Sequence, residues 1–167
     1  FALAARRFSP QRVVGADVAL EMIKLGVDKV RKSRSNAVLL GGDAENLPFR
    51  DKSYDIVMSA FGVRNFGHIS AGLAETHRVL RPGGQLLVLD FCEPTFPIVR
   101  GLYLLYFRRI LPFLGGLISG ERQAYEYLPR SVSNFPQGGD FVDLMKQVGF
   151  IENSVTKLTF GICSIYL

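Results

Sequence analysis

The chain is poor in cysteine and has no residues at metal-ligand spacing. Its 167 residues include two cysteines, Cys92 and Cys163, which are far apart in the sequence and have no histidine nearby. This pattern argues against a zinc motif and against a disulfide framework, so no metal site is predicted. We expect both cysteines to fill core strand positions as small apolar residues, as in proteins of a reducing compartment such as the cytoplasm.

Clustered positive charge is also absent. The net charge is +5, but no run of Lys and Arg is longer than two residues. Nucleic-acid-binding proteins concentrate these residues on one face or one helix, so no nucleic-acid partner is expected. The scattered positive charge fits either ordinary solubility or attraction to anionic lipid at a membrane surface.

No segment has the uninterrupted apolar character of a transmembrane helix. In the longest candidate, residues 98–119, Arg100 is near the start, Arg108 and Arg109 are in the middle, and Pro112 is followed by two glycines. A charge at the centre of a span costs about 2.5–3.5 kcal/mol on insertion. We therefore predict two short helices with apolar faces here and no membrane span.

The ends of the sequence lack the usual signals of a complete protein. The first residue is Phe rather than Met, no signal-peptide pattern follows it, and the last residues, GICSIYL, stop within a strand-like run. We expect a fragment cut at both ends.

Apolar runs alternate with amphipathic helices over the first half of the chain. Four segments are typical of strands: RVVGAD, NAVLLGGD, YDIVMSAF and QLLVLDF. Two segments have apolar residues at helical spacing: ALEMIKLGVDKV, with Leu20, Ile23, Val27 and Val30, and ISAGLAETHRVL, which stops at RPGG. This alternation predicts an α/β fold with a mostly parallel sheet and helices on both faces.

The alternation is interrupted at residues 94–137, which are rich in aromatic residues, Arg, Pro and Gly and are predicted to form a helical insertion. After it, DFVDLMKQVGF predicts a helix with Asp140 as N-cap, Gly149 at its end, and Phe141, Leu144, Met145 and Val148 facing inward. IENSVTKL and TFGICSIYL predict a C-terminal antiparallel pair. We expect one domain, 1–167, that contains the insertion.

Acidic residues end two of the predicted strands. Asp17 closes RVVGAD and Asp43 closes NAVLLGGD, and open parallel sheets bind ligands beyond the carboxyl ends of their strands. Asp17 can accept hydrogen bonds from both hydroxyls of a ribose, although such an acid is about as often a helix N-cap. Asp43 can accept from an adenine amino group while the Ala44 N–H donates to a ring nitrogen, with residues 47–49 as an apolar wall.

Several segments together resemble a known enzyme class. VVGADVALEMI, GDAENLPFRDKSYDIV and RVLRPGGQLLVLDF are similar to S-adenosylmethionine-dependent methyltransferases of the Rossmann-like class. FGVRN, the GG of LPFLGGLISG, and AYEYLPRSVSNFP at 124–136 are more specific. With them the whole chain resembles the ubiquinone/menaquinone biosynthesis C-methyltransferase family.

The resemblance implies a cofactor, a substrate and site residues. S-adenosyl-L-methionine would be held by Asp17 at the ribose and by Asp43 and Ala44 at the adenine. The substrate would be the ring of a lipid-soluble polyprenyl quinol, in menaquinone and/or ubiquinone biosynthesis, with the naphthoquinol weakly favoured. The protein would be cytoplasmic, in peripheral contact with the inner face of the membrane. Neither the oligomeric state nor the length of the isoprenoid tail is predicted.

The chain departs from the family pattern in two places. The glycine-rich loop that follows the first, central strand is absent together with that strand, so we expect this fragment alone to be unstable and inactive. The family's serine two residues before the glycine of FGxRN is replaced by Ala60, and Ser59 is predicted to lie on the opposite face of the strand.

Arg64 and Asn65 are the candidate catalytic residues. A ring carbon is a poor nucleophile until a neighbouring hydroxyl, with a pKa of roughly 10 for a phenol, loses its proton. Arg64 stays charged and is a poor base, but it can stabilise the oxyanion or orient a water. Asn65 can donate to the same oxygen. Alternatively, Arg64 pairs with a carboxylate such as Glu93, and Asn65 caps the following helix.

Other side chains are weaker candidates. His68 is considered as a base, whereas His77 is expected to be a surface or packing residue. Tyr125 and Tyr127 either form a lid over the quinol or pack within the insertion. Its apolar residues either line a groove for the tail, contact the bilayer, or pack on the sheet: Leu102, Leu105, Phe107, Ile110, Leu111 and Phe113.

Three other functions stay open at this point. The first is a methyltransferase of the same fold with a soluble phenolic or sterol acceptor. The second is an oxidoreductase, because Asp17 would suit a nicotinamide ribose equally well. The third is a non-catalytic scaffold that keeps the methyltransferase fold.

Overall fold

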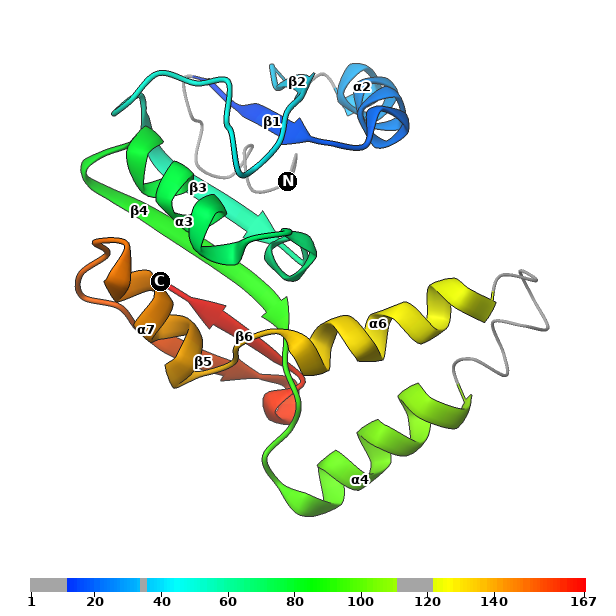
Figure 1. Cartoon of the computed structure of the whole chain (residues 1–167). Helices are drawn as coiled ribbons and strands as arrows, with labels where there is room; N and C mark the ends of the chain where they lie inside the picture. The colour runs from blue at the N-terminus through cyan, green and yellow to red at the C-terminus, as the bar shows by residue number, and fades with distance from the viewer. Residues whose placement is uncertain (1–11, 34–35, 111–121) are drawn as a thin grey trace.

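The structure, a computed structural model, describes residues 12–33, 36–110 and 122–167. Strands β1 (Val14–Asp17) and β2 (Val38–Gly41) pair in parallel, and helix α2 (Leu20–Ser33) connects them (Figure 1). No residue of α2 is buried: Leu20 is exposed, whereas the other residues of its predicted apolar face, Ile23, Val27 and Val30, are half-buried.

The second sheet has the strand order β3-β4-β6-β5. β3 (Tyr54–Ala60) and β4 (Leu80–Phe91) are parallel, and helix α3 (Ile69–Val79) lies between them in the sequence. β6 (Cys163–Tyr166) is antiparallel both to β4 and to β5 (Val155–Leu158). The predicted α/β fold, with parallel strands first and an antiparallel pair at the C-terminus, is therefore confirmed.

Helices α3 and α7 (Gly139–Gln147) cover one face of this sheet, in front in Figure 1. The core forms there because the apolar stripes of both helices meet the inward side chains of β4 and β6. It contains Val63, Leu73, Leu80, Leu86, Val88, Phe135, Phe141, Met145 and Tyr166. Leu144 and Val148 pack against it, so the predicted inward face of α7 is confirmed.

The N-cap prediction for α7 was wrong. Gly138, at a φ of 59°, is the N-cap and makes no side-chain bond, and Asp140 lies in the first turn. An acid in the first turn still interacts favourably with the helix dipole. Gly149, at a φ of 106°, follows the helix as predicted.

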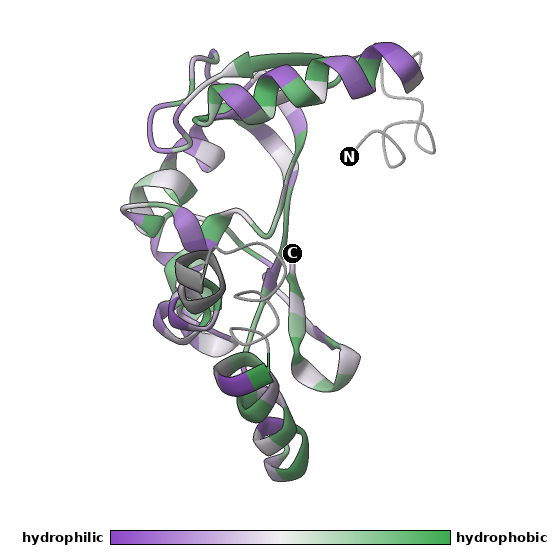
Figure 2. Cartoon of the chain, turned by 90° about the vertical axis from the view of Figure 1, so that its right-hand side faces the viewer, coloured by the Kyte–Doolittle hydropathy of each residue, from purple (hydrophilic) through white to green (hydrophobic). Residues whose placement is uncertain are grey.

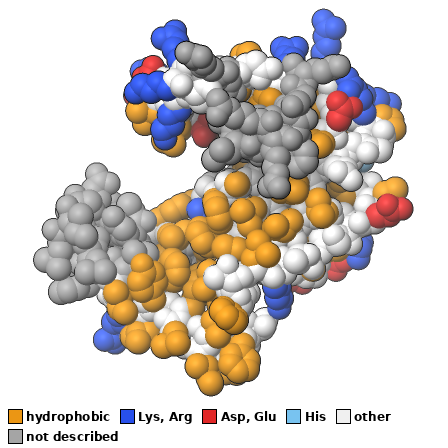
Figure 3. Space-filling model, turned by 180° about the vertical axis from the view of Figure 1, so that it is seen from behind, with side chains coloured by type: hydrophobic (Ala, Val, Ile, Leu, Met, Phe, Trp, Pro, Cys, Tyr) orange, Lys and Arg blue, Asp and Glu red, His pale blue; other side chains and the backbone are white. Residues whose placement is uncertain are grey.

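Apolar side chains are exposed on the opposite face of the sheet. β3 alternates, with Val57 and Ser59 half-buried and Ile56, Met58 and Ala60 exposed. Figure 3, seen from behind, shows hydrophobic side chains gathered over this face and over the insertion. Ser59 and Ala60 thus lie on opposite faces, as predicted.

The two sheets have unpaired edges between them. In the described part of the chain, no strand pairs with the second edge of β1 or with the second edge of β3. This is the arrangement expected if the central strand of the fold is not among the described residues.

The insertion is helical, as predicted. α4 (Pro97–Leu105) continues into a π-helical turn (Tyr106–Ile110), and α6 (Arg122–Asn134) returns to the sheet. Leu111 and Phe113 lie outside the described residues. Of the helices that are described, none has the length and apolar character needed to cross a membrane.

The prediction for His77 holds, and that for the cysteines holds in part, because Cys92 is buried but lies just after β4, and Cys163 lies in β6 but is only half-buried. Cys92 is buried, with its Sγ 3.1 Å from the Gly161 carbonyl, and burial raises the pKa of its thiol. Cys163 is half-buried in β6. His77 packs edge-on against the ring of Phe150, with 5.1 Å between the ring centroids.

Candidate functional site

Asp17 and Asp43 lie at the same edge of the β1–β2 pair. Asp17 is paired with Gly41, and its carbonyl accepts the N–H of Gly42 at 3.0 Å, so Asp43 follows directly beside it. The Asp17 Oδ1 accepts from the Ala19 N–H at 2.8 Å, and the Asp43 Oδ1 accepts from the Glu45 N–H at 2.9 Å. Both side chains are exposed, and each Oδ2 is without a hydrogen bond to the described residues.

Each acid therefore stabilises its local turn with one oxygen, and its other oxygen has no hydrogen bond to the described residues. The helix-cap alternative for Asp17 does not hold, because Ala19 lies at the N-cap position, where its carbonyl accepts from the Ile23 N–H, and Asp17 only stabilises the turn ahead of α2. The N–H of Ala44 also has no hydrogen-bond partner in the part of the chain that the structure describes.

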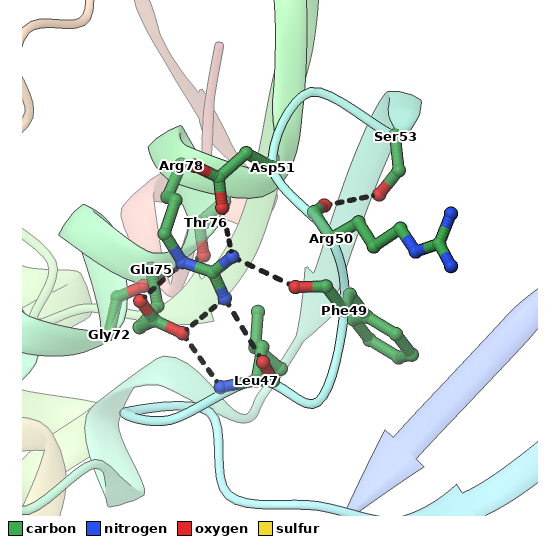
Figure 4. Close-up of polar contacts among 9 residues, drawn as sticks. All are labelled: Leu47, Phe49, Arg50, Asp51, Ser53, Gly72, Glu75, Thr76 and Arg78. Atoms are coloured by element: carbon green, nitrogen blue, oxygen red, sulfur yellow. Dashed lines mark hydrogen bonds and ion pairs between the residues drawn. The ribbon is translucent and has the colours of Figure 1, made fainter.

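The loop after Asp43 is held against α3 by Arg78, as Figure 4 shows. The Arg78 guanidinium donates to both oxygens of Glu75 at 2.7 Å, to Asp51 at 2.6 Å, and to the carbonyls of Leu47 and Phe49 at 3.0 and 2.8 Å. Glu75 in turn accepts from the Leu47 N–H at 2.8 Å, and its pKa is lowered mainly by the hydrogen bond from Arg78. The predicted apolar wall is thus fixed by a network that sequence reasoning missed.

A second contact ties the same loop to the turn before α3. Glu45 accepts from the His68 N–H at 2.9 Å, and its other oxygen lies 3.1 Å from His68 Nδ1. These contacts, with the backbone hydrogen bond the larger, lower the pKa of Glu45. His68 therefore serves as a partner of Glu45, and it is not among the residues that line the pocket beside Arg64.

Arg64 pairs with Asp90, at the end of β4. The Arg64 Nη1 donates to the Asp90 Oδ1 at 2.8 Å, and the Arg64 N–H donates to Oδ2 at 3.2 Å. The Arg64 side chain is 10% exposed and that of Asp90 is 0% exposed. The pair is therefore nearly removed from water.

The alternative that Arg64 pairs with a carboxylate is confirmed, but the carboxylate is that of Asp90 and not that of Glu93, the example named. Glu93 accepts from Ser133 Oγ at 2.6 Å and from Arg100 at 3.3 Å. Asp90 is better placed, because Ala60 of β3 pairs with Leu89 of β4 and Asp90 directly follows Leu89. The sequence did contain a signal, because Asp90 is an acid near the end of the run QLLVLDF, as Asp17 and Asp43 are at the ends of theirs.

The turn that carries Arg64 is strained and well supported. Phe61 has a φ of 58°, in the left-handed region, which costs a non-glycine residue about 1–3 kcal/mol. Its carbonyl accepts from Arg64 Nη1 at 2.5 Å and from Asn65 Nδ2 at 3.3 Å, and its N–H donates to Leu89 at 2.7 Å. Its ring packs on Phe91, with centroids 4.5 Å apart. These contacts hold the conformation in place.

A pocket of about 450 Å³ lies between this turn and α6. The Tyr127 hydroxyl of α6 donates to Asn65 Oδ1 at 2.8 Å and so closes one side. Asn65 does not cap α3, whose N-cap is His68 without a side-chain bond, so that alternative is wrong. The side chain of Tyr125 lies outside the described residues. The lining includes Arg64, Phe66, Ile69, Tyr127, Arg130 and Asn134.

The structure thus brings together two groups of the predicted site residues. Asp17, Asp43 and Ala44 form one group at the edge of β1 and β2. Arg64 and Asn65 form the other, beside the pocket. The Glu45–His68 contact joins the two groups. Sequence reasoning missed Asp90 and Arg130, although Arg130 lies within the specific segment 124–136.

Comparison with known families covers the whole chain. Residues 1–167 match the sequence model of the ubiE/COQ5 methyltransferase family. The chain is 41% identical over 162 residues to a ubiquinone/menaquinone biosynthesis C-methyltransferase of Syntrophotalea carbinolica, covering 97% of this chain and 68% of that one. It is 38% identical over 156 residues to a demethylmenaquinone methyltransferase of Chlorobaculum parvum, covering 93% and 63%.

A third relative is the human mitochondrial 2-methoxy-6-polyprenyl-1,4-benzoquinol methylase, 41% identical over 157 residues, with 93% of this chain and 48% of the relative covered. The chain thus spans about half to two thirds of the length of these relatives.

Two solved structures with the same fold are named as methyltransferases. A putative methyltransferase of Bacillus halodurans superposes with a TM-score of 0.63 at 21% identity, covering 94% of this chain and 60% of that one. Phosphoethanolamine N-methyltransferase 2 of Haemonchus contortus, in complex with S-adenosyl-L-methionine, gives 0.65 at 21% identity, covering 93% and 31%. At these identities the likeness concerns the fold.

Proposed function

Because the chain belongs to the ubiE/COQ5 methyltransferase family, we propose that its function is C-methylation of a polyprenyl quinol ring with S-adenosyl-L-methionine as methyl donor. The observation that carries the proposal is the Glu45–His68 contact, which joins the acidic edge of β1 and β2 to the turn that bears Arg64. A cofactor at the first group and an acceptor at the second would then be neighbours.

The groups at the acidic edge fit an adenosine. Asp17 and Asp43 each offer a free, exposed carboxylate oxygen, which matches the ribose hydroxyls and the adenine amino group. The Ala44 N–H matches a ring nitrogen. When bound there, S-adenosyl-L-methionine supplies an electrophilic methyl group on its sulfonium. The chain's own contribution is to hold the adenosine and to keep the acceptor in a fixed orientation.

Arg64 contributes a preorganised cationic group at the acceptor pocket. Its Nη1 donates to the Asp90 carboxylate and to the Phe61 carbonyl, while its Nη2 has no hydrogen bond to the described residues. A guanidinium held in this way needs no reorganisation when negative charge develops on a ring oxygen. Asn65 would orient the acceptor together with Tyr127, which it already contacts.

Contact with the inner face of the membrane belongs to the same proposal. Ile98, Leu102 and Leu105 of α4 are exposed, and Leu102 is 64% exposed. Figure 2 shows α4, the lowest helix in the view, as mostly hydrophobic. The exposed Arg100 and Arg109 lie on and just after this helix. Apolar and cationic side chains side by side suit an anionic lipid surface, where a polyprenyl quinol would be found.

Methyl transfer from labelled S-adenosyl-L-methionine tests the proposal. The full-length protein is incubated with a demethylated naphthoquinol, a benzoquinol or a soluble phenol, and Asp43→Ala is the control for cofactor use. We expect the naphthoquinol to be the best acceptor and Asp43→Ala to lose transfer. Equal transfer to the soluble phenol would favour the alternative acceptor class, and no transfer to any acceptor would favour the non-catalytic scaffold.

A further inference from the structure

The pocket beside Arg64 contains one arginine whose charge is not compensated by any side chain that the structure describes. The charge of Arg64 is balanced by the fully buried Asp90, 2.8 Å away. Arg130, on α6, also lines the pocket, and it has neither an ion pair nor a hydrogen bond to the described residues. None of the described residues that line the pocket is acidic. Among the described groups, the pocket therefore has a net charge of about one positive unit.

The remaining walls suit a flat ring. Phe66, Ile69, Tyr127 and Phe135 supply aromatic and apolar surface, and Asn134 adds a polar group. The volume of about 450 Å³ lies within the range of small-molecule sites. An aromatic acceptor with one ionisable hydroxyl would match both the walls and the charge.

We propose that Arg130 binds the ring oxygen of the acceptor as an oxyanion, so that this pocket selects the acceptor in its phenolate form. This inference rests on the proposed function. On binding, the O–H bond breaks and its proton goes to solvent, while Arg130 stays protonated and forms an ion pair with the oxygen. Arg64 cannot supply this charge alone, because Asp90 neutralises it and the carbonyl of Phe61 shares its Nη1.

An uncompensated cation should lower the pKa of the bound hydroxyl. An opposite charge within about 4–6 Å typically shifts a pKa by about 1–3 units. Arg130 is exposed, so we expect the lower end, a shift of about one unit, or tenfold more phenolate at a given pH. The phenolate is the form in which the ring carbon is nucleophilic.

The test uses 4-nitro-1-naphthol, whose absorbance distinguishes phenol from phenolate, bound to the full-length protein without cofactor. We expect the bound probe to titrate about one pH unit below the free probe in the wild type. Arg130→Gln should abolish the shift and Arg130→Lys should keep most of it. Arg81→Gln, which changes an exposed arginine outside the pocket, should leave the shift unchanged.

Three outcomes would overturn the proposal. They are an unshifted probe in the wild type, an equal shift in Arg130→Gln, and loss of probe binding in both Arg130 variants. Because Arg130 is exposed, its replacement should not unfold the protein. A thermal melt of each variant checks that any loss of probe binding does not come from misfolding.

A second readout separates this inference from the proposed function. The pH profile of kcat for quinol methylation, which reports groups in the enzyme–substrate complex, should move up by about one unit in Arg130→Gln. An unchanged profile in an active enzyme refutes the role of Arg130 and leaves the function standing. A probe shift that depends on Arg130, in a protein that methylates no quinol, refutes the function and leaves the charged pocket standing.

Discussion

Replacing Asp90 by asparagine should strongly destabilise the protein, because this carboxylate is the counter-charge of a nearly buried guanidinium. Asp90 accepts from Arg64 Nη1 at 2.8 Å, from the Arg64 N–H at 3.2 Å and from the Phe91 N–H at 2.9 Å. Removal of one partner of a buried pair costs about 3–5 kcal/mol. Asparagine keeps the shape and one acceptor oxygen, so we expect the lower end, about 3 kcal/mol.

Urea unfolding of the full-length protein measures this loss. With slopes of about 1–3 kcal/mol/M, a loss of 3 kcal/mol moves the midpoint down by roughly 1–3 M. The double variant Asp90→Asn/Arg64→Gln should lose less than the sum of the two single losses, by about 0.5–3 kcal/mol, since neither charge is then left unpaired. Such coupling is expected only if the two groups stabilise each other.

The matched control is an exposed ion pair. Arg81 and Asp55 also form a pair, at 2.5 Å, but their side chains are 50% and 79% exposed. Asp55→Asn should change stability by less than about 1 kcal/mol. The reasoning is refuted if Asp90→Asn is as mild as Asp55→Asn, or if the losses at Asp90 and Arg64 simply add.

Four further predictions concern the chemistry, the pH dependence, the membrane and residues 1–167 produced alone. Arg64→Lys should lower turnover in a single-turnover assay while cofactor affinity, measured by equilibrium dialysis, stays nearly constant; unaltered turnover contradicts the proposed role. The pKa of Glu45 is lowered in the folded state, so its stabilising contribution is complete above about pH 4.5 and is lost as the pH falls through the folded pKa. Thermal melts from pH 7 to 3 should therefore fall less steeply for Glu45→Gln than for the wild type, and parallel curves would contradict this. The double variant Leu102→Asp/Leu105→Asp should reduce sedimentation of the protein with phosphatidylglycerol vesicles. Ile151→Asp, which changes an exposed apolar residue outside the insertion, should not reduce it. Equal losses in both variants would contradict membrane contact through α4. Residues 1–167 produced alone should melt without cooperativity and should not bind the cofactor, because β1 and β3 each have an unpaired edge; a cooperative melt with micromolar binding would refute this.

The sequence predicted the fold well where periodicity and turn chemistry act locally. The run from Leu86 to Leu89 is apolar because β4 lies within its sheet, between β3 and β6, and the stripe on α7 is regular because Phe141 and Met145 must reach the core. The position of the acidic residues at the strand ends could also be predicted from the sequence. Parallel strands end at one edge, so Asp17 and Asp43 had to meet if the strand order was right.

The partners of the site residues could not be predicted in the same way. Whether Arg64 contacts Asp90 or Glu93 depends on the register of β3 against β4. A shift of this register by a few residues would bring a different carboxylate of the β4 segment next to Arg64. The contact between Tyr127 and Asn65 joins residues 62 positions apart in the sequence. No local pattern encodes such a distance, and the same is true of the Arg78 network around Leu47.

The turn FGVRN combines a structural and a chemical role, and the two depend on each other. The carbonyl of Phe61, a residue with a left-handed φ, accepts from Arg64 Nη1 and Asn65 Nδ2, and these hydrogen bonds orient both side chains. Asp90 then neutralises Arg64, which allows a guanidinium to be nearly buried without an unpaired charge. A guanidinium fixed in this way can still turn Nη2 toward developing negative charge, but together with Asp90 it adds no net charge to the pocket. Arg130 on α6 is exposed and has no such ion pair with the described residues. The different burial of the two arginines therefore gives them different roles in the proposal: Arg64 shapes the pocket, and Arg130 supplies its net charge.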